Sequence, residues 1–214
     1  VTFKFAVGDG KQYDSTPNTA TVTVAPVDDA PKITSSSGRT TPVNVARAIL
    51  IDPGLALVDP DATGSATGTY ADTGTGYLQI SITTNKSAGD VLSVNNFGTG
   101  AGQIGFDGTT ITYAGTTIGT IDGTLNGKGN QALKINLNNA ASNDAVQALA
   151  RAITIRTSDR DSDSAAQKTI TFTASDGENA NTVGATRTVD FSASQFDNFD
   201  PSATRNVISS NGAN

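Results

Sequence analysis

The sequence contains no cysteine, methionine, tryptophan or histidine. Without cysteine and histidine the chain can form no disulfide, no thiolate or imidazole metal site, and no Cys-His or Ser-His catalytic pair. It also lacks any run of about 18 apolar residues, so the sequence predicts no helix inserted in a membrane. With no charged and apolar leader and no initiating methionine, we expect a mature or excised part of a longer protein.

Glutamate is nearly absent as well, because Glu178 is the one glutamate among 20 acidic residues. Glutamate suits helix surfaces, whereas aspartate suits turns, helix caps and oxygen-rich cation sites. The net charge of −6 and the pI of about 4.5 argue against nucleic acid or an anionic membrane as a partner. The composition therefore favours an acidic protein of strands and loops, and the 22 glycines favour tight turns.

Short runs of alternating apolar and polar residues are typical of strands in an antiparallel β-sandwich, so the sequence predicts an all-β fold. One segment, SNDAVQALARAI, instead has Val146, Leu149, Ala150 and Ile153 at helical spacing, after a cap at Ser142 or Asn143. It predicts one short helix. The glycine-rich segments 95–110 and 119–131 are predicted to form hairpins or loops, since they match neither a phosphate-binding loop nor a calcium-binding nonapeptide repeat. The predicted strands lie in residues 1–7, 18–24, 48–58, 77–83, 109–114, 132–137, 153–157, 169–174 and 186–191.

One hairpin occurs twice in the sequence, at an offset of 167 residues. VTFKFAVGDG at 1–10 aligns without a gap with KTITFTASDG at 168–177, and the same offset aligns NTATVTVAP at 18–26 with ATRTVDFSA at 185–193. Two strands alone are marginally stable in water, and these carry apolar residues that need a facing sheet. We therefore expect the first copy to be completed by upstream chain or by strand addition to an identical subunit.

Further motifs make a resemblance specific. They are VDDAP at 27–31, ILIDPGLALVDPDA at 49–62, AGDVLSV at 88–94, AVQALARAITI at 145–155 and TSDRDSDSAAQKTITFTASDG at 157–177. Together they resemble the cadherin-like and immunoglobulin-like tandem repeats of very large bacterial surface adhesins. The resemblance implies an extracellular location on the bacterial cell surface, a role as a structural repeat, and calcium at the joints between modules.

The resemblance also implies a domain organisation. Residues 1–27 would be the C-terminal hairpin of a preceding repeat, and 28–31 a linker. Residues 32–194 would form a complete immunoglobulin-like (cadherin-like) Greek-key β-sandwich with one short inserted helix, and 195–214 a C-terminal linker or tail. Neighbouring repeats or identical subunits would be partners through the first hairpin.

In such a Greek-key sandwich the chain enters at the end where the B–C and F–G loops lie. Asp28 and Asp29 of the linker should then lie beside Asp59 and Asp61, with Asp176 nearby. Converging carboxylates repel one another unless a hard cation such as Ca²⁺ neutralises them. The alternative is that these aspartates are ordinary turn residues.

At the opposite end, SDRDSD places Asp159, Asp161 and Asp163 at alternate positions, which would direct three carboxylates toward the next module. They form a second candidate calcium site, although Arg160 can instead pair with one of them. The EF-hand pattern does not fit, because the loop lacks its glycine and its distal glutamate.

Other functions have weaker support in the sequence. Two carboxylates can hydrolyse a glycoside, but no pair is singled out here and no tryptophan is present to stack sugars, so we expect no enzyme. Phe3, Phe5, Phe172 and Phe191 are interpreted as hairpin core. Two alternatives stay open. One is an adhesin module whose glycine-rich loops bind a host or matrix glycan or protein, and the other is a subunit that self-assembles into a surface layer or fibre.

Overall fold

The computed structural model describes residues 1–25, 27–42, 47–61, 70, 76–158, 167–178 and 184–191. Within these ranges the protein is mostly β-sheet with one helix, which confirms the all-β prediction. None of the described residues form a helix long and apolar enough to cross a membrane. The elements are β1 (Thr2–Phe5), β2 (Asn18–Thr21), β3 (Lys32–Thr34), β4 (Ile49–Leu50), β5 (Ala56–Val58), β6 (Tyr77–Thr84), β7 (Asp90–Val94), β8 (Ile104–Phe106), β9 (Thr110–Tyr113), β10 (Thr116–Asn126), β11 (Leu133–Leu137), α1 (Asn143–Arg151), β12 (Ile153–Thr157), β13 (Gln167–Ser175) and β14 (Ala185–Asp190).

The largest sheet is a curled antiparallel sheet of seven strands in the order β14-β13-β6-β11-β10-β9-β8. Alternate residues of its central strands are buried, as expected for a sheet with one face on the core. Leu78 and Ile80 of β6 and Ile170 and Phe172 of β13 are all 0 % exposed. The apolar core lies on this face of the sheet.

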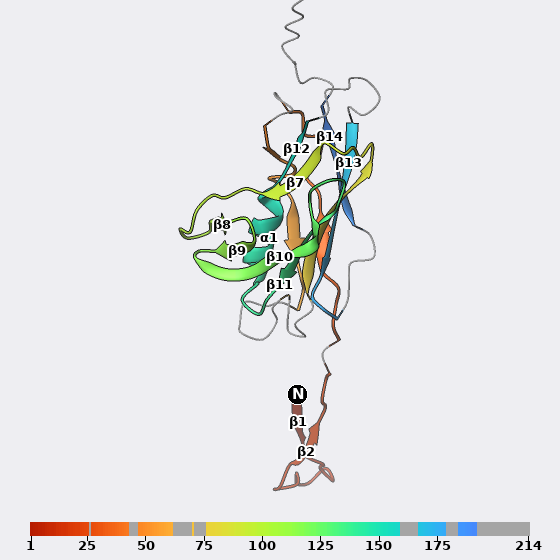
Figure 1. Ribbon diagram of the computed structural model, residues 1–214. Helices are drawn as coiled ribbons and strands as arrows, with labels where there is room; N and C mark the ends of the chain where they lie inside the picture. The colour runs from red at the N-terminus through yellow and green to blue at the C-terminus, as the bar shows by residue number, and fades with distance from the viewer. Residues whose placement is uncertain are drawn as a thin grey trace, which may run out of the picture.

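Smaller elements cover that face (Figure 1). A three-stranded sheet, β4-β12-β7, and a two-stranded sheet, β3-β5, contribute buried residues to the same core, and α1 contacts β5, β8 and β9. A backbone hydrogen bond from Leu92 N to Gly127 O, 2.8 Å long, joins β7 to the turn after β10. The elements from β3 to β14 form the main body of the protein, which is therefore built of layers around one apolar cluster.

The predicted helix forms, and its cap is Ser142. The Ser142 hydroxyl accepts a hydrogen bond from Ala145 N at 3.3 Å, which satisfies one of the free N–H groups of the first turn. Val146, Leu149 and Ala150 are buried as expected. The apolar face of the helix does not extend to Ile153, because the helix ends at Arg151 and Ile153 starts β12. The β-branched residues at 153–155 favour a strand there.

The single strand predicted over 48–58 is wrong, because the structure has two short strands, β4 and β5, in different sheets. The break lies at Asp52, Pro53 and Gly54. The Asp52 carboxylate accepts hydrogen bonds from Ser35 Oγ at 2.7 Å and from Gly54 N at 3.2 Å. These bonds close a turn that proline and glycine favour, so the chain changes sheets within a few residues.

Candidate functional site

The two copies of the hairpin have the same register. β1 pairs with β2 so that Thr2 lies opposite Thr21, and β13 pairs with β14 so that Thr169 lies opposite Thr188. Each residue of the second pair is numbered 167 above its counterpart in the first. The repeat in the sequence is thus also a repeat of strand pairing, and equivalent positions of the two hairpins can be compared directly.

One face of each hairpin carries most of its apolar side chains, and this face, called the inward face, is buried in the second hairpin and exposed in the first. The apolar side chains of the second hairpin are at most 7 % exposed: Ile170, Phe172, Val189 and Phe191. Their counterparts in the first hairpin are 50 to 73 % exposed: Phe3, Phe5, Val22 and Val24. Figure 1 shows the first hairpin apart from the main body, joined to it by the linker. The interpretation as hairpin core is therefore confirmed for the two phenylalanines of the second copy, whereas those of the first copy are exposed.

Acidic residues do gather where the linker meets the body. Asp29 N donates to Asp61 Oδ2 at 2.6 Å, and Asp61 N donates to Asp59 Oδ1 at 2.9 Å. Asn143, the first residue of α1, then holds Asp59 through two hydrogen bonds, from Asp59 N to Asn143 Oδ1 at 2.7 Å and from Asn143 Nδ2 to Asp59 O at 2.9 Å. A continuous chain of bonds thus connects the linker, the segment after β5 and the helix N-terminus.

Tyr70 lies beside this group and within the electrostatic influence of Asp59 and Asp176. Its side chain is fully buried and its hydroxyl donates to Asn143 Oδ1 at 3.0 Å. Burial, and then the charges of Asp59 and Asp176, raise the pKa of Tyr70 well above its ordinary value. The Tyr70 hydroxyl therefore stays protonated and acts as a donor beside two carboxylates.

Of the five acids predicted for this end, Asp29, Asp59 and Asp61 are joined by hydrogen bonds, and Asp176 lies near enough to Tyr70 for its charge to act on the hydroxyl. Asp59 and Asp176 are buried, whereas Asp28, Asp29 and Asp61 are exposed, and Asp176 also accepts a hydrogen bond from Glu178 N at 2.8 Å. No group of three or more acidic side chains among the described residues is arranged to hold a metal ion. The donors are oxygens of the kind that calcium prefers, so their chemistry fits the ion. The calcium site stays a prediction.

The second predicted calcium site, Asp159, Asp161 and Asp163, lies outside the described residues. Among the described residues, the structure contains a buried ion pair, in which Lys168 Nζ lies 2.9 Å from Asp90 Oδ2. Sequence reasoning missed this pair, and it missed the roles of Tyr70 and Asn143. A signal for Lys168 was present, because it has the same parity as Ile170 and Phe172 on β13 and must face inward with them.

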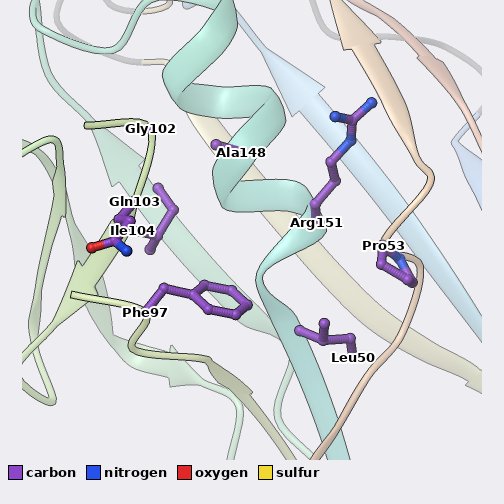
Figure 2. A pocket seen from close by; sticks show the side chains of 8 residues that line it. All are labelled: Leu50, Pro53, Phe97, Gly102, Gln103, Ile104, Ala148 and Arg151. Atoms are coloured by element: carbon purple, nitrogen blue, oxygen red, sulfur yellow. The ribbon is translucent and has the colours of Figure 1, made fainter. Parts of the chain in front are cut away.

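A pocket of about 400 Å³ lies beside one glycine-rich loop (Figure 2). Phe97, half exposed, forms one wall of it. Two polar side chains of the lining already form hydrogen bonds within the protein. Gln103 Oε1 accepts from Gly100 N at 3.0 Å, and Arg151 Nε donates to Leu55 O at 2.7 Å. In Figure 2 the guanidinium of Arg151 points away from Phe97. The lining therefore favours no particular class of ligand. Its residues are Leu50, Pro53, Phe97, Gly102, Gln103, Ile104, Ala148 and Arg151.

Comparison of the chain with protein-family models, with curated proteins and with solved structures gave no match in any of the three.

Proposed function

We propose that this chain is a structural repeat of a secreted bacterial adhesin or cell-surface filament. In this proposal, residues 32–194 form a complete cadherin-like module, and residues 1–27 close the preceding module. One observation carries it: the first hairpin exposes apolar side chains at the positions where the second hairpin buries them, in the same register. A hairpin with such a face requires a covering layer.

The covering layer can be described by analogy with the second hairpin. There, β13 lies between β14 and β6, with Phe172 opposite Ile80 and Ile170 opposite Ile82. In the preceding module, β1 would pair in the same way with a counterpart of β6, and its inward face would pack on an equivalent core. A repeat joined in this way occupies length between an anchored end and a binding end of a long surface protein.

Amide hydrogen exchange tests this proposal. In the 214-residue chain at high dilution we expect fast exchange throughout β1 and β2, because two isolated strands are marginally stable, and slow exchange in β13, which serves as an internal reference. A longer chain that includes the preceding module should slow exchange in β1 to the level of β13. Slow exchange in β1 of the 214-residue chain by itself would contradict the proposal.

The joint is proposed to bind calcium through the acids at the entry end, Asp29, Asp59, Asp61 and Asp176, with Asp28 beside them. The ion would supply positive charge that offsets the repulsion among these carboxylates. In the proposed array, the preceding module would add oxygen ligands from its counterpart of the 159–163 segment. The isolated chain then has only part of the site.

Calcium titration by calorimetry should therefore give weak binding to the isolated chain, with Kd in the range of about 10⁻⁴ to 10⁻³ M, and tighter binding when the preceding module is present. A calcium concentration tenfold above Kd should add about 1.4 kcal/mol to the free energy of unfolding. Asp61→Ala should weaken binding. Asp107→Ala is the control, because Asp107 is an exposed turn residue whose carboxylate accepts from Thr109 N and Thr110 N. Equal binding by both variants would mean that the entry acids are only turn residues.

A further inference from the structure

The main body contains a buried carboxylate that the second hairpin neutralises. Asp90, on β7, is 1 % exposed, and Lys168, on β13, is 2 % exposed. Lys168 Nζ donates to Asp90 Oδ2 at 2.9 Å and to Asn85 O at 2.6 Å. Because β7 belongs to the three-stranded sheet and β13 to the seven-stranded sheet, this ion pair connects the two layers.

A second cation of the same hairpin satisfies a group of backbone carbonyls. Arg187, on β14, is 7 % exposed. Its Nη1 donates to Ser36 O at 2.8 Å, Ser37 O at 3.0 Å and Gly38 O at 3.0 Å. Burial raises the pKa of Asp52, but hydrogen bonds from Ser36 and Ser35 and the charge of Arg187 outweigh that effect and hold it below its ordinary value. Residues 36–38 and Thr40 are thus held by this guanidinium.

Both cations lie on the inward face of the second hairpin. Lys168 has the parity of the buried Ile170, and Arg187 has that of the buried Val189. At the equivalent positions the first hairpin has Val1 and Ala20. Its equivalent face therefore has no charged residue, although its register is the same and Phe5 and Val22 match Phe172 and Val189.

We propose that Lys168 and Arg187 make this module select its own closing hairpin over the similar hairpin of the neighbouring repeat. This inference rests on the proposed function, because the neighbouring repeat supplies the competing hairpin. If the first hairpin occupied the place of the second, Asp90 would be buried without its cation, and the carbonyls of residues 36–38 would lose their donor. Such losses disfavour the exchange by roughly a hundredfold or more.

Selection of this kind has a physical reason in a chain of repeats. Interchangeable hairpins invite domain swapping and misassembly between neighbouring modules. A buried polar contact that one hairpin can make and the other cannot acts against the wrong pairing at little cost to the right one. By the same argument, the partner of the first hairpin has an apolar residue at the position equivalent to Asp90.

A strand graft in the full chain tests the inference. Residues 168–175 and 185–191 are replaced by the sequences of residues 1–8 and 18–24, which gives the main body the inward face of the first hairpin. We expect the unfolding equilibrium constant of the main body, measured by denaturant titration, to rise by roughly a hundredfold or more. The same graft that keeps Lys168 and Arg187 should recover most of this loss. A graft that keeps Thr171 and Thr173, which lie on the other face of β13, is the matched control and should recover nothing.

Three results would overturn the inference: unchanged unfolding of the complete graft, no recovery when Lys168 and Arg187 are kept, or equal recovery by the control. A complete graft that does not fold counts as the expected loss, and the graft that keeps both cations must then fold. None of these outcomes depends on a preceding module. Failure of the proposed function would instead be seen in the exchange of β1, so the two failures are distinguishable.

Discussion

Replacing Phe172 by alanine is expected to lower the free energy of unfolding by about 3 to 5 kcal/mol, whereas the same change at Phe5 is expected to alter it by less than about 0.5 kcal/mol. The two phenylalanines occupy equivalent positions of the repeated hairpin. Phe172 is fully buried in the core, so its removal leaves a cavity, while Phe5 is 51 % exposed in this chain. The two variants therefore compare the same substitution in a buried and in an exposed environment.

Denaturant unfolding of both variants measures this difference. If the proposed preceding module is added upstream, the effect of Phe5→Ala should rise toward that of Phe172→Ala, because Phe5 would then become part of a core. A large loss of stability from Phe5→Ala in the 214-residue chain would mean that the first hairpin already packs against something in it. A small loss from Phe172→Ala would contradict the position of β13 in the core.

Replacing Lys168 by methionine is expected to destabilise the main body by about 3 to 5 kcal/mol. Methionine keeps most of the volume but leaves the buried Asp90 without the cation that faces it. Among the described residues, Asp90 Oδ1 accepts no hydrogen bond, so the carboxylate depends on the contacts of its other oxygen, from Lys168 and from Ser87 N at 2.8 Å.

Two further variants separate loss of the ion pair from loss of the lysine itself. Lys86→Met, at an exposed position, should change stability by less than about 0.5 kcal/mol. The double variant Lys168→Met with Asp90→Leu should recover much of the stability, because an apolar pair of similar volume removes the unpaired charge. If the double variant is as unstable as Lys168→Met, the cost comes from packing and not from the buried charge.

Sequence pattern predicted the elements in which one face is buried and the other is solvated. β6, β9, β11, β12, β13 and β14 alternate in burial or composition, and each lies largely within a predicted strand. β10 was missed for a physical reason: its sequence, TTIGTIDGTLN, contains Gly119 and Gly123, which favour turns in isolation. Its pairing with both β9 and β11 holds it extended, and that stabilisation comes from residues distant in sequence.

The acidic residues where the linker meets the main body were likewise predicted in part. The positions of Asp29, Asp59 and Asp61 followed from an assumed topology, and the structure does bring them into one hydrogen-bonded chain. Asn143 was expected at most to cap the helix, yet it connects Asp59 to Tyr70. No local pattern indicates this role, because it exists only once α1 packs beside the end of β5.

The contact between Thr40 and β14 has a consequence for a protein under tension. Thr40 forms a parallel bridge with Val189, through Thr40 N to Thr188 O at 3.0 Å and Asp190 N to Thr40 O at 2.8 Å. Arg39 adds an ion pair with Asp190 at 2.8 Å. A segment near the start of the main body thus runs alongside its last strand in the same direction. A force that pulls the two ends of the main body apart slides these segments past each other. The bonds between them then carry the load in shear and must break together. Antiparallel end strands would instead separate one bond at a time.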